Sequence, residues 1–257
     1  MLTQLHSSLS NKTNYIVDIG ASTGVSYDPV YSFISNTNYT GLCIEGDSNK
    51  VGLLRQNISP SFEIYNGYVT PDNIIDIFAK HNVPKELDIL KIDIDGYDLD
   101  VLRVLLKEYS PKILIAEINE KIPPPVHFEI PYRENYEWDF SHCFGFSIQS
   151  GHSVISKHGL SIIDIYELNN MLCVNTEMAK KMNIHIPIDI YDLYRSRYVN
   201  NAERYSFHWN ESVNYWLTMN NPSELCDEIR RYFETKNERS TWPVKTKTHM
   251  AEFICTL

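Results

Sequence analysis

Residues 15–24 read YIVDIGASTG, an apolar run that ends near Asp18 and enters a turn containing Gly20 and Gly24. A buried strand followed by such a turn is typical of an α/β sheet that binds a ligand at its strand ends. The spacing is G-x-x-x-G, not the G-x-G-x-x-G of dinucleotide binders, so no diphosphate is expected there. We expect the two glycines to let an amino-acid moiety approach the backbone, with Ser22 between them. The alternative is a tight turn whose glycines serve packing alone.

Apolar runs and helix-like stretches alternate over residues 1–175, which is the rhythm of βαβ units. The sequence predicts seven strands and five helices in this part of the chain. The strands are expected at 15–19, 40–44, 62–65, 87–92, 113–118, 160–166 and 171–174. The helices are expected at 31–35, 49–57, 71–81, 98–109 and 147–158.

Two segments interrupt this rhythm. The stretch KIPPPVHFEIPYRENYEWDFSHC at 121–143 has three consecutive prolines, which forbid a helix or central strand, and many aromatic residues. We expect an aromatic, proline-rich insertion at 121–146 that covers a site within a domain spanning 1–186. Residues 187–257 are expected to form a helical extension, whose aromatic side chains favour helix packing or a homo-oligomer interface.

Composition narrows the classes of function. The formal net charge is −10, with scattered Lys and Arg, which disfavours a nucleic-acid partner. The five cysteines form no C-x-x-C pair, which disfavours a disulfide framework or a zinc site. No run reaches the roughly 20 apolar residues of a membrane span, and the first residues do not resemble a secretion signal. We therefore expect a cytoplasmic protein.

The next two loops complete a predicted nucleoside site. Glu45 ends the second strand in CIEGD, where its carboxylate can accept hydrogen bonds from both hydroxyls of a ribose, and Gly46 follows it. The segment NGYVTPDN follows the third strand and contains Tyr68, which is placed to frame an adenine ring. Alternatively, Glu45 faces only water and the second segment only begins a helix.

Acidic residues also end the fourth and fifth strands. In LDILKIDIDGYD, Asp93 and Asp95 share one face, and Glu117 and Asn119 share a face in ILIAEIN. Because adjacent buried carboxylates are unfavourable, we expect them in the cleft at the strand ends. Asp93, Glu117 and Asn119 offer the oxygen ligands that Mg²⁺ prefers. The alternative is that these acids only position a substrate and cap the following helix.

His142 lies in the aromatic insertion beside an acid and an indole. A neutral imidazole there can act as the general base for a hydroxyl acceptor. Asp93, Asp95 and His142 are therefore the candidate catalytic residues.

Taken together, these motifs resemble the FkbM-like family of S-adenosylmethionine-dependent methyltransferases. The resemblance implies a Rossmann-like seven-stranded sheet, mostly parallel, with helices on both faces and the last strand antiparallel. It implies S-adenosylmethionine as cofactor, held by Asp18, Gly20, Gly24 and Glu45, and O-methylation of a sugar, a surface-glycan precursor such as a nucleotide-activated one, or a natural product. The matching segments are VDIGASTG, CIEGD, LDILKIDIDGYD, ILIAEIN, NEKIPPPVHF, WDFSHCFGFSI and NNMLCVN.

Three other functions are alternatives to methyl transfer. A haloacid-dehalogenase-type phosphatase would use the D-x-D-G of Asp93 and Asp95, but Tyr97 follows where a Thr is expected. A nicotinamide oxidoreductase would need a second glycine in the first turn. A non-catalytic scaffold would keep the nucleoside site and bind a partner through the aromatic extension.

Overall fold

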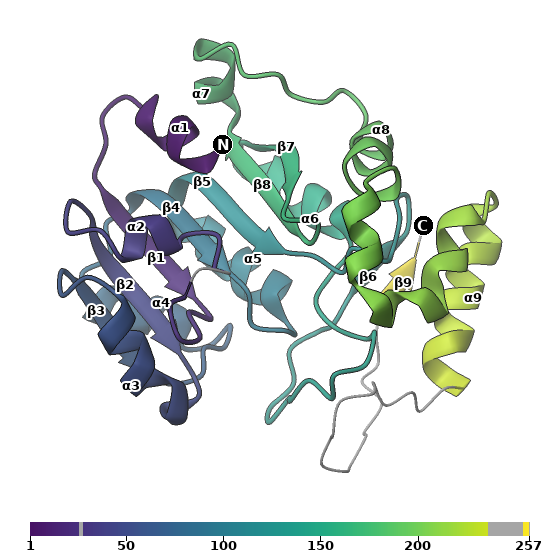
Figure 1. Cartoon of the computed structure of the whole chain (residues 1–257), viewed down its shortest axis with the longest axis horizontal. Coiled ribbons are helices and arrows are strands. Elements are labelled where there is room, and N and C mark those ends of the chain that lie inside the picture. Colours follow the sequence, from purple (N-terminus) through teal and green to yellow (C-terminus); the bar gives the residue numbers. More distant parts are fainter. Residues whose placement is uncertain (26–27, 236–253, 257) are drawn as a thin grey trace.

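The computed structural model describes residues 1–25, 28–235 and 254–256, and its centre is a twisted seven-stranded sheet (Figure 1). The strand order is β3-β2-β1-β4-β5-β8-β7. The strands are β1 (Tyr15–Ile19), β2 (Thr40–Glu45), β3 (Phe62–Asn66), β4 (Glu86–Ile92), β5 (Ser110–Glu117), β7 (Leu160–Tyr166) and β8 (Asn170–Asn175).

All pairings from β3 to β5 are parallel, whereas β8 runs antiparallel to both of its neighbours. Strands β2 and β3 are added to the sheet on one side of β1, whereas β4 and β5 are added on its other side. The carboxyl ends of β1 and β4 therefore form the switch point of the topology. Open α/β sheets bind their ligands at such a point.

Helices cover both faces of the sheet, as Figure 1 shows. Alternate residues of each central strand enter two separate apolar cores, for example Leu90 in one and Ile89 in the other. The first core includes side chains of α4 (Ile74–Lys80), α5 (Asp98–Glu108), α6 (Ile148–Ile155) and α8 (Ile190–Tyr194). The second includes side chains of α1 (Leu2–Ser7), α2 (Tyr31–Ile34), α3 (Ser48–Asn57) and α7 (Thr176–Lys181).

The insertion and the extension share a third apolar core. In this core Phe128 of the insertion lies with Trp216 and Ile229 of the extension, all of them buried. A two-stranded sheet of β6 (His127–Glu129) and β9 (Ile254–Thr256) joins the same two segments. The further helices of the extension are η2 (Arg195–Val199), η3 (Ala202–Ser206), η4 (His208–Thr218) and α9 (Pro222–Thr235), whereas the short η1 (Ser156–His158) joins α6 to β7.

The predicted fold class is confirmed, including the antiparallel last strand of the main sheet. The seven strands and five helices lie where the sequence places them, with ends shifted by a few residues at most. The β6–β9 pair was not predicted, because its partners are far apart in sequence and each is short. Part of the expected extension, residues 236–253, lies outside the described residues. No helix in the described ranges is both long enough and apolar enough to span a bilayer.

Candidate active site

The first turn and the end of β2 lie side by side at the carboxyl edge of the sheet. The amides of Gly20 and Ala21 both donate to the carbonyl of Ile44, over 2.9 and 3.0 Å. On the other side, the amide of Asp93 donates to the carbonyl of Ile19 over 3.1 Å. The ends of β2, β1 and β4 thus form one continuous edge, as the nucleoside-site prediction requires.

The two glycines of the first turn make room for the protein itself, and their contact with a cofactor stays a prediction. A Cβ on Gly20 would lie 1.8 Å from the carbonyl oxygen of Asp93, and its φ of +80° is unfavourable for other residues. A Cβ on Gly24 would lie 2.8 Å from Leu54 and 2.9 Å from Ile58. Gly20 thus allows a close approach of two backbone segments, and Gly24 allows close packing of side chains. The spacing of glycines in the sequence is the same whether they make room for the protein or for a ligand.

Glu45 connects the two loops of the predicted nucleoside site. Its Oε2 accepts from the amide of Ser22 and its Oε1 from the amide of Asp47, both at 2.7 Å. Ser22 has a left-handed φ of 49°, which turns its amide toward this carboxylate. Each carboxylate oxygen retains a second lone pair, so Glu45 can still accept hydrogen bonds from a ligand.

Gly46 and Tyr68 lie against each other beside Glu45. A Cβ on Gly46 would come within 2.6 Å of the Tyr68 ring, so only glycine lets the ring lie over this backbone. The ring is 72% exposed, and the Asn73 side chain fixes its loop by donating to the Tyr68 carbonyl over 3.0 Å. An exposed ring next to a strand-end acid suits an adenine and its ribose.

Asp18, which is predicted to hold the cofactor, lies beneath the glycine turn, and this role stays a prediction. Its carboxylate is fully buried and lies 3.2 Å from the Nζ of Lys91, on the adjacent strand position. Lys91 also donates to the carbonyl of Gly20 over 2.9 Å and lies 3.4 Å from Asp28. Burial raises the pKa of Asp18, and the charge of Asp28 raises it further, while Lys91 lowers it. Asp18 therefore acts through Lys91: it pairs with the ammonium group that donates to the carbonyl of Gly20.

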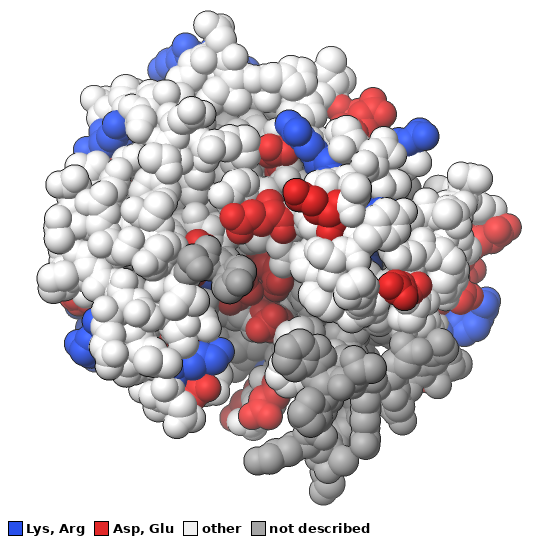
Figure 2. Space-filling view, in the orientation of Figure 1, with Lys and Arg blue, Asp and Glu red and all other residues white. Residues whose placement is uncertain are grey.

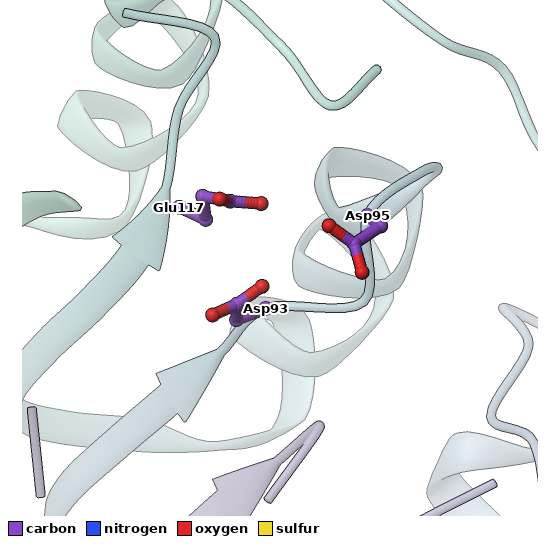
Figure 3. Close-up of side chains that lie close together, drawn as sticks. All are labelled: Asp93, Asp95 and Glu117. Atoms are coloured by element: carbon purple, nitrogen blue, oxygen red, sulfur yellow. The ribbon is translucent and has the colours of Figure 1, made fainter. Parts of the chain in front are cut away.

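Three carboxylates from the next two strand ends converge at the same edge. Asp93 follows β4, Asp95 lies in the loop after it, and Glu117 ends β5 (Figure 3). One oxygen from each of them lies within 4.8 Å of the others. Asp93 also lies 3.6 Å from the Nζ of Lys91, so the cluster continues the charged network beneath the glycine turn.

The protonation of the cluster is strongly perturbed. Burial raises the pKa of Asp95 to about 7, and the charges of Asp93 and Asp98 act in the same direction. Burial also raises the pKa of Glu117 well above its ordinary value, with Asp93 and Asp95 as the next contributors. Groups perturbed in this way at a strand end are typical of functional sites.

The loop between Asp93 and α5 is held from two sides. Asp98 accepts from the amides of Ile94 and Gly96, over 2.8 and 2.9 Å. On the outer side, the insertion contributes Tyr136, whose hydroxyl donates to the carbonyl of Asp95 over 3.4 Å. A Cβ on Gly96 would lie 2.5 Å from the Tyr136 ring. The insertion therefore touches the loop that carries Asp95, in line with the expected covering segment.

Asn119 and His142 anchor the insertion in this structure. The fully buried Asn119 donates through Nδ2 to the carbonyls of His142 and Phe144, over 2.8 and 2.9 Å. The imidazole of His142 shares a hydrogen bond of 3.0 Å with Ser212 in the extension. The metal-ligand role of Asn119 and the catalytic role of His142 stay predictions.

Sequence reasoning missed three side chains that shape the site. Lys91 lies within the quoted fourth-strand motif LDILKIDIDGYD, but its role beneath the glycine turn was not recognised, and neither was that of Asp28. Asp98 was taken only as the start of a helix. Its position two residues after a glycine, in D-G-x-D, is a signal for a side chain that accepts backbone amides of its own loop.

Acidic side chains gather in the hollow between the sheet and the insertion with its extension, and Figure 2 shows this face. Few basic side chains are visible in that hollow. Such a surface repels polyanions and attracts cations.

A family model described as "Methyltransferase FkbM domain" matches residues 61–142. This segment contains β3, β4, β5 and most of the insertion, and therefore both strand ends that carry the carboxylate cluster. The match confirms the resemblance noted in the sequence and shows an S-adenosylmethionine-dependent methyltransferase enzyme. It disfavours the phosphatase and oxidoreductase alternatives. No curated protein sequence matches this chain.

Solved methyltransferase structures are similar to this chain at low identity. An amino pentose methyltransferase from Micromonospora echinaspora is 8% identical with a TM-score of 0.40, over 68% of this chain and 88% of that one. A TehB-like methyltransferase from Corynebacterium glutamicum is 11% identical with a TM-score of 0.38, over 67% and 85%. An Aquifex aeolicus methyltransferase is 10% identical with a TM-score of 0.40, over 67% and 88%. We infer no substrate from these similarities.

Proposed function

We propose that this methyltransferase transfers the methyl group of S-adenosylmethionine to a hydroxyl of a sugar, a surface-glycan precursor such as a nucleotide-activated one, or a natural product. One observation carries the proposal: Glu45 and the Gly20 turn lie side by side, on the same sheet edge as the Asp93, Asp95 and Glu117 carboxylates. A nucleoside-binding acid and a group of potential proton acceptors thereby face one cleft.

The cofactor would lie across the ends of β1, β2 and β4. Glu45 would accept the ribose hydroxyls with its remaining lone pairs, and the exposed ring of Tyr68 would lie against the adenine. The turn around Ser22 and the backbone next to Asp93 would meet the methionine moiety. Asp18 supports this arrangement from below through Lys91.

Methyl transfer requires alignment, removal of one proton and exclusion of water, because the sulfonium is already an activated donor. If no cation is bound, Asp95, whose pKa is raised to about 7, can accept the proton of an acceptor hydroxyl near neutral pH. His142 is the second candidate, provided that its imidazole leaves Ser212. A Mg²⁺ ion at the ends of β4 and β5 also belongs to the proposal, because it would lower the pKa of a bound hydroxyl.

The acceptor would contact the insertion and the extension. Their shared core around Trp216 forms a body separate from the two cores of the sheet, next to the cleft. We accordingly propose a cofactor domain at 1–186 and a substrate-selecting part formed by residues 121–146 and 187–257. The acidic hollow disfavours a nucleic acid, and among the proposed acceptors it favours an uncharged sugar or natural product over a nucleotide-activated precursor, whose phosphates are negatively charged.

Calorimetry with S-adenosylhomocysteine, followed by methyl transfer to a pool of sugars and metabolites with mass spectrometry of the products, tests the proposal. We expect saturable binding and a product heavier by one methyl group. Binding without transfer to any acceptor would favour the scaffold function. Absence of binding would refute the cofactor assignment itself.

A further inference from the structure

We infer that Asp93, Asp95 and Glu117 form a binding site for one hard divalent cation. The structure adds Asp95 to the set expected from the sequence. The Nδ2 of Asn119 is engaged by the insertion, and its Oδ1, the atom that could bind a cation, is buried with no hydrogen-bond partner among the described residues. One oxygen from each carboxylate lies within 4.8 Å of the others. In Figure 3 the three side chains point toward one shared point from two strand ends.

Among the described residues, no lysine or arginine forms an ion pair with Asp95 or Glu117, and the charges of Lys50 and Lys121 act on these two acids only from beyond ion-pair distance. Lys91 lies 3.6 Å from Asp93, but it is closer to Asp18 and Asp28, at 3.2 and 3.4 Å. One ammonium therefore serves three carboxylates, before Asp95 and Glu117 are considered. Buried charges in proteins are normally paired or coordinate a metal.

Glu117 gives an observation independent of the clustering. Its Oε1 accepts from the Nδ2 of Asn169 over 3.0 Å, which fixes the direction of the carboxylate. Its Oε2 is buried and has no hydrogen-bond partner in the described part of the chain. Buried carboxylate oxygens are rarely left unsatisfied, so this atom calls for a partner other than the residues that the structure describes.

The surroundings resemble a prepared coordination site. Metal-ligating carboxylates are usually held by further hydrogen bonds, and here Asn169 orients Glu117 while Asp98 fixes the loop of Asp95 through two backbone amides. An all-oxygen donor set favours Mg²⁺ or Mn²⁺ over metals that prefer nitrogen or sulfur. Three protein ligands leave positions of an octahedral ion open to water or to a ligand.

The location of the cation site suggests a role in binding the acceptor, and this inference rests on the proposed methyl transfer. The open positions would face the cleft next to the predicted methionine moiety, where an acceptor must lie. A cation there would hold one hydroxyl, or two neighbouring hydroxyls of a sugar, and favour the deprotonated form. The inference therefore narrows the acceptor to a molecule with oxygen atoms that can chelate a metal.

Binding of Mn²⁺, measured by electron paramagnetic resonance on the chelator-treated full-length protein, tests the site directly. We expect one Mn²⁺ per chain, displaced by excess Mg²⁺. Glu117→Gln and Asp95→Asn should each weaken binding by about tenfold or more. Glu108→Gln serves as the matched control, because this exposed acid at the end of α5 pairs only with Lys85 among the described residues and should leave binding unchanged.

Thermal unfolding and calorimetry with S-adenosylhomocysteine separate the outcomes. The metal-free variants should unfold no earlier than the parent, since each removes one of several mutually repelling carboxylates. Absence of Mn²⁺ binding, with S-adenosylhomocysteine still bound, would overturn the cation site and leave the proposed methyl transfer standing. If Glu108→Gln weakened Mn²⁺ binding equally, the cation site would also be overturned, because the ion would then be attracted by the acidic surface in general. Loss of methyl transfer in EDTA, restored by Mg²⁺, would link the ion to turnover.

Discussion

Replacing Lys91 by methionine tests whether the buried charge network supports the glycine turn. Lys91 is 2% exposed, lies within 3.6 Å of three carboxylates, and donates to the Gly20 carbonyl. Methionine has a similar volume, so the change removes charge without leaving a large cavity. Removing one partner of a buried ion pair typically costs about 3–5 kcal/mol, and Asp18 is the partner left behind.

The loss should depend on pH in a defined direction. Burial already raises the pKa of Asp18, and removal of Lys91 takes away the main influence that lowers it. An acid whose pKa is higher in the folded than in the unfolded state stabilises the fold at low pH, and this stabilisation disappears as the pH rises through the folded pKa. The deficit of Lys91→Met should therefore be largest at pH 8 and smaller at pH 5.

Urea unfolding followed by circular dichroism at both pH values measures this effect. Lys85→Met is the matched control, because that lysine is exposed and its pair with Glu108 is worth at most about 1 kcal/mol. Adding Asp18→Asn to Lys91→Met should restore a large part of the stability at pH 8. A deficit below about 1 kcal/mol at both pH values, with no rescue by the second substitution, would refute the assigned role of the network.

Three further predictions concern the cofactor turn, the ribose acid and the third core. Gly20→Ala should destabilise the protein far more than Gly159→Ala when both are compared by thermal unfolding, because both positions have a left-handed φ but only the first Cβ would meet a backbone atom, at 1.8 Å. Glu45→Ala should weaken binding of S-adenosylhomocysteine by about 1–3 kcal/mol in calorimetry, whereas Glu63→Ala should not, and unchanged affinity would exclude Glu45 from ribose binding. Trp216→Ala should cost about 3–5 kcal/mol in urea unfolding because this side chain is fully buried, against less than about 1 kcal/mol for the half-exposed Trp209, and equal losses would contradict the described packing.

The fold could be predicted because its signals are local. Each βα unit contains a run such as 87–92 with a helix-period stretch after it, and the handedness and layering of such units follow general rules. Strand ends could also be predicted, so Glu45, Asp93 and Glu117 were placed on one edge correctly. The pairing of β6 with β9 depends on contacts between distant segments, for which neither segment carries a signal of its own.

The site was predicted less completely, for a physical reason that differs from residue to residue. The burial of Asp18 depends on Lys91 in the neighbouring strand, and a single sequence does not show which charges meet across strands. Asn119 offers both a donor and an acceptor, and the structure shows its donor engaged by the insertion. The missing Cβ of Gly20 suits a ligand and a close carbonyl equally well in the sequence, and only the structure shows the carbonyl of Asp93 there.

Tyr136 is one of the contacts that join the insertion to the sheet domain, beside the pair of Arg103 with Glu129. Its ring packs against the main core and against the core shared by the insertion and the extension, and its hydroxyl reaches the carbonyl of Asp95. A tilt of the insertion on acceptor binding would therefore reach, through the Tyr136 hydroxyl, the loop of the residue proposed to take the proton or hold the cation. An acceptor that docks poorly would then leave Asp95 out of position even with the cofactor fully bound. Such an acceptor would lower the rate of methyl transfer without weakening cofactor binding.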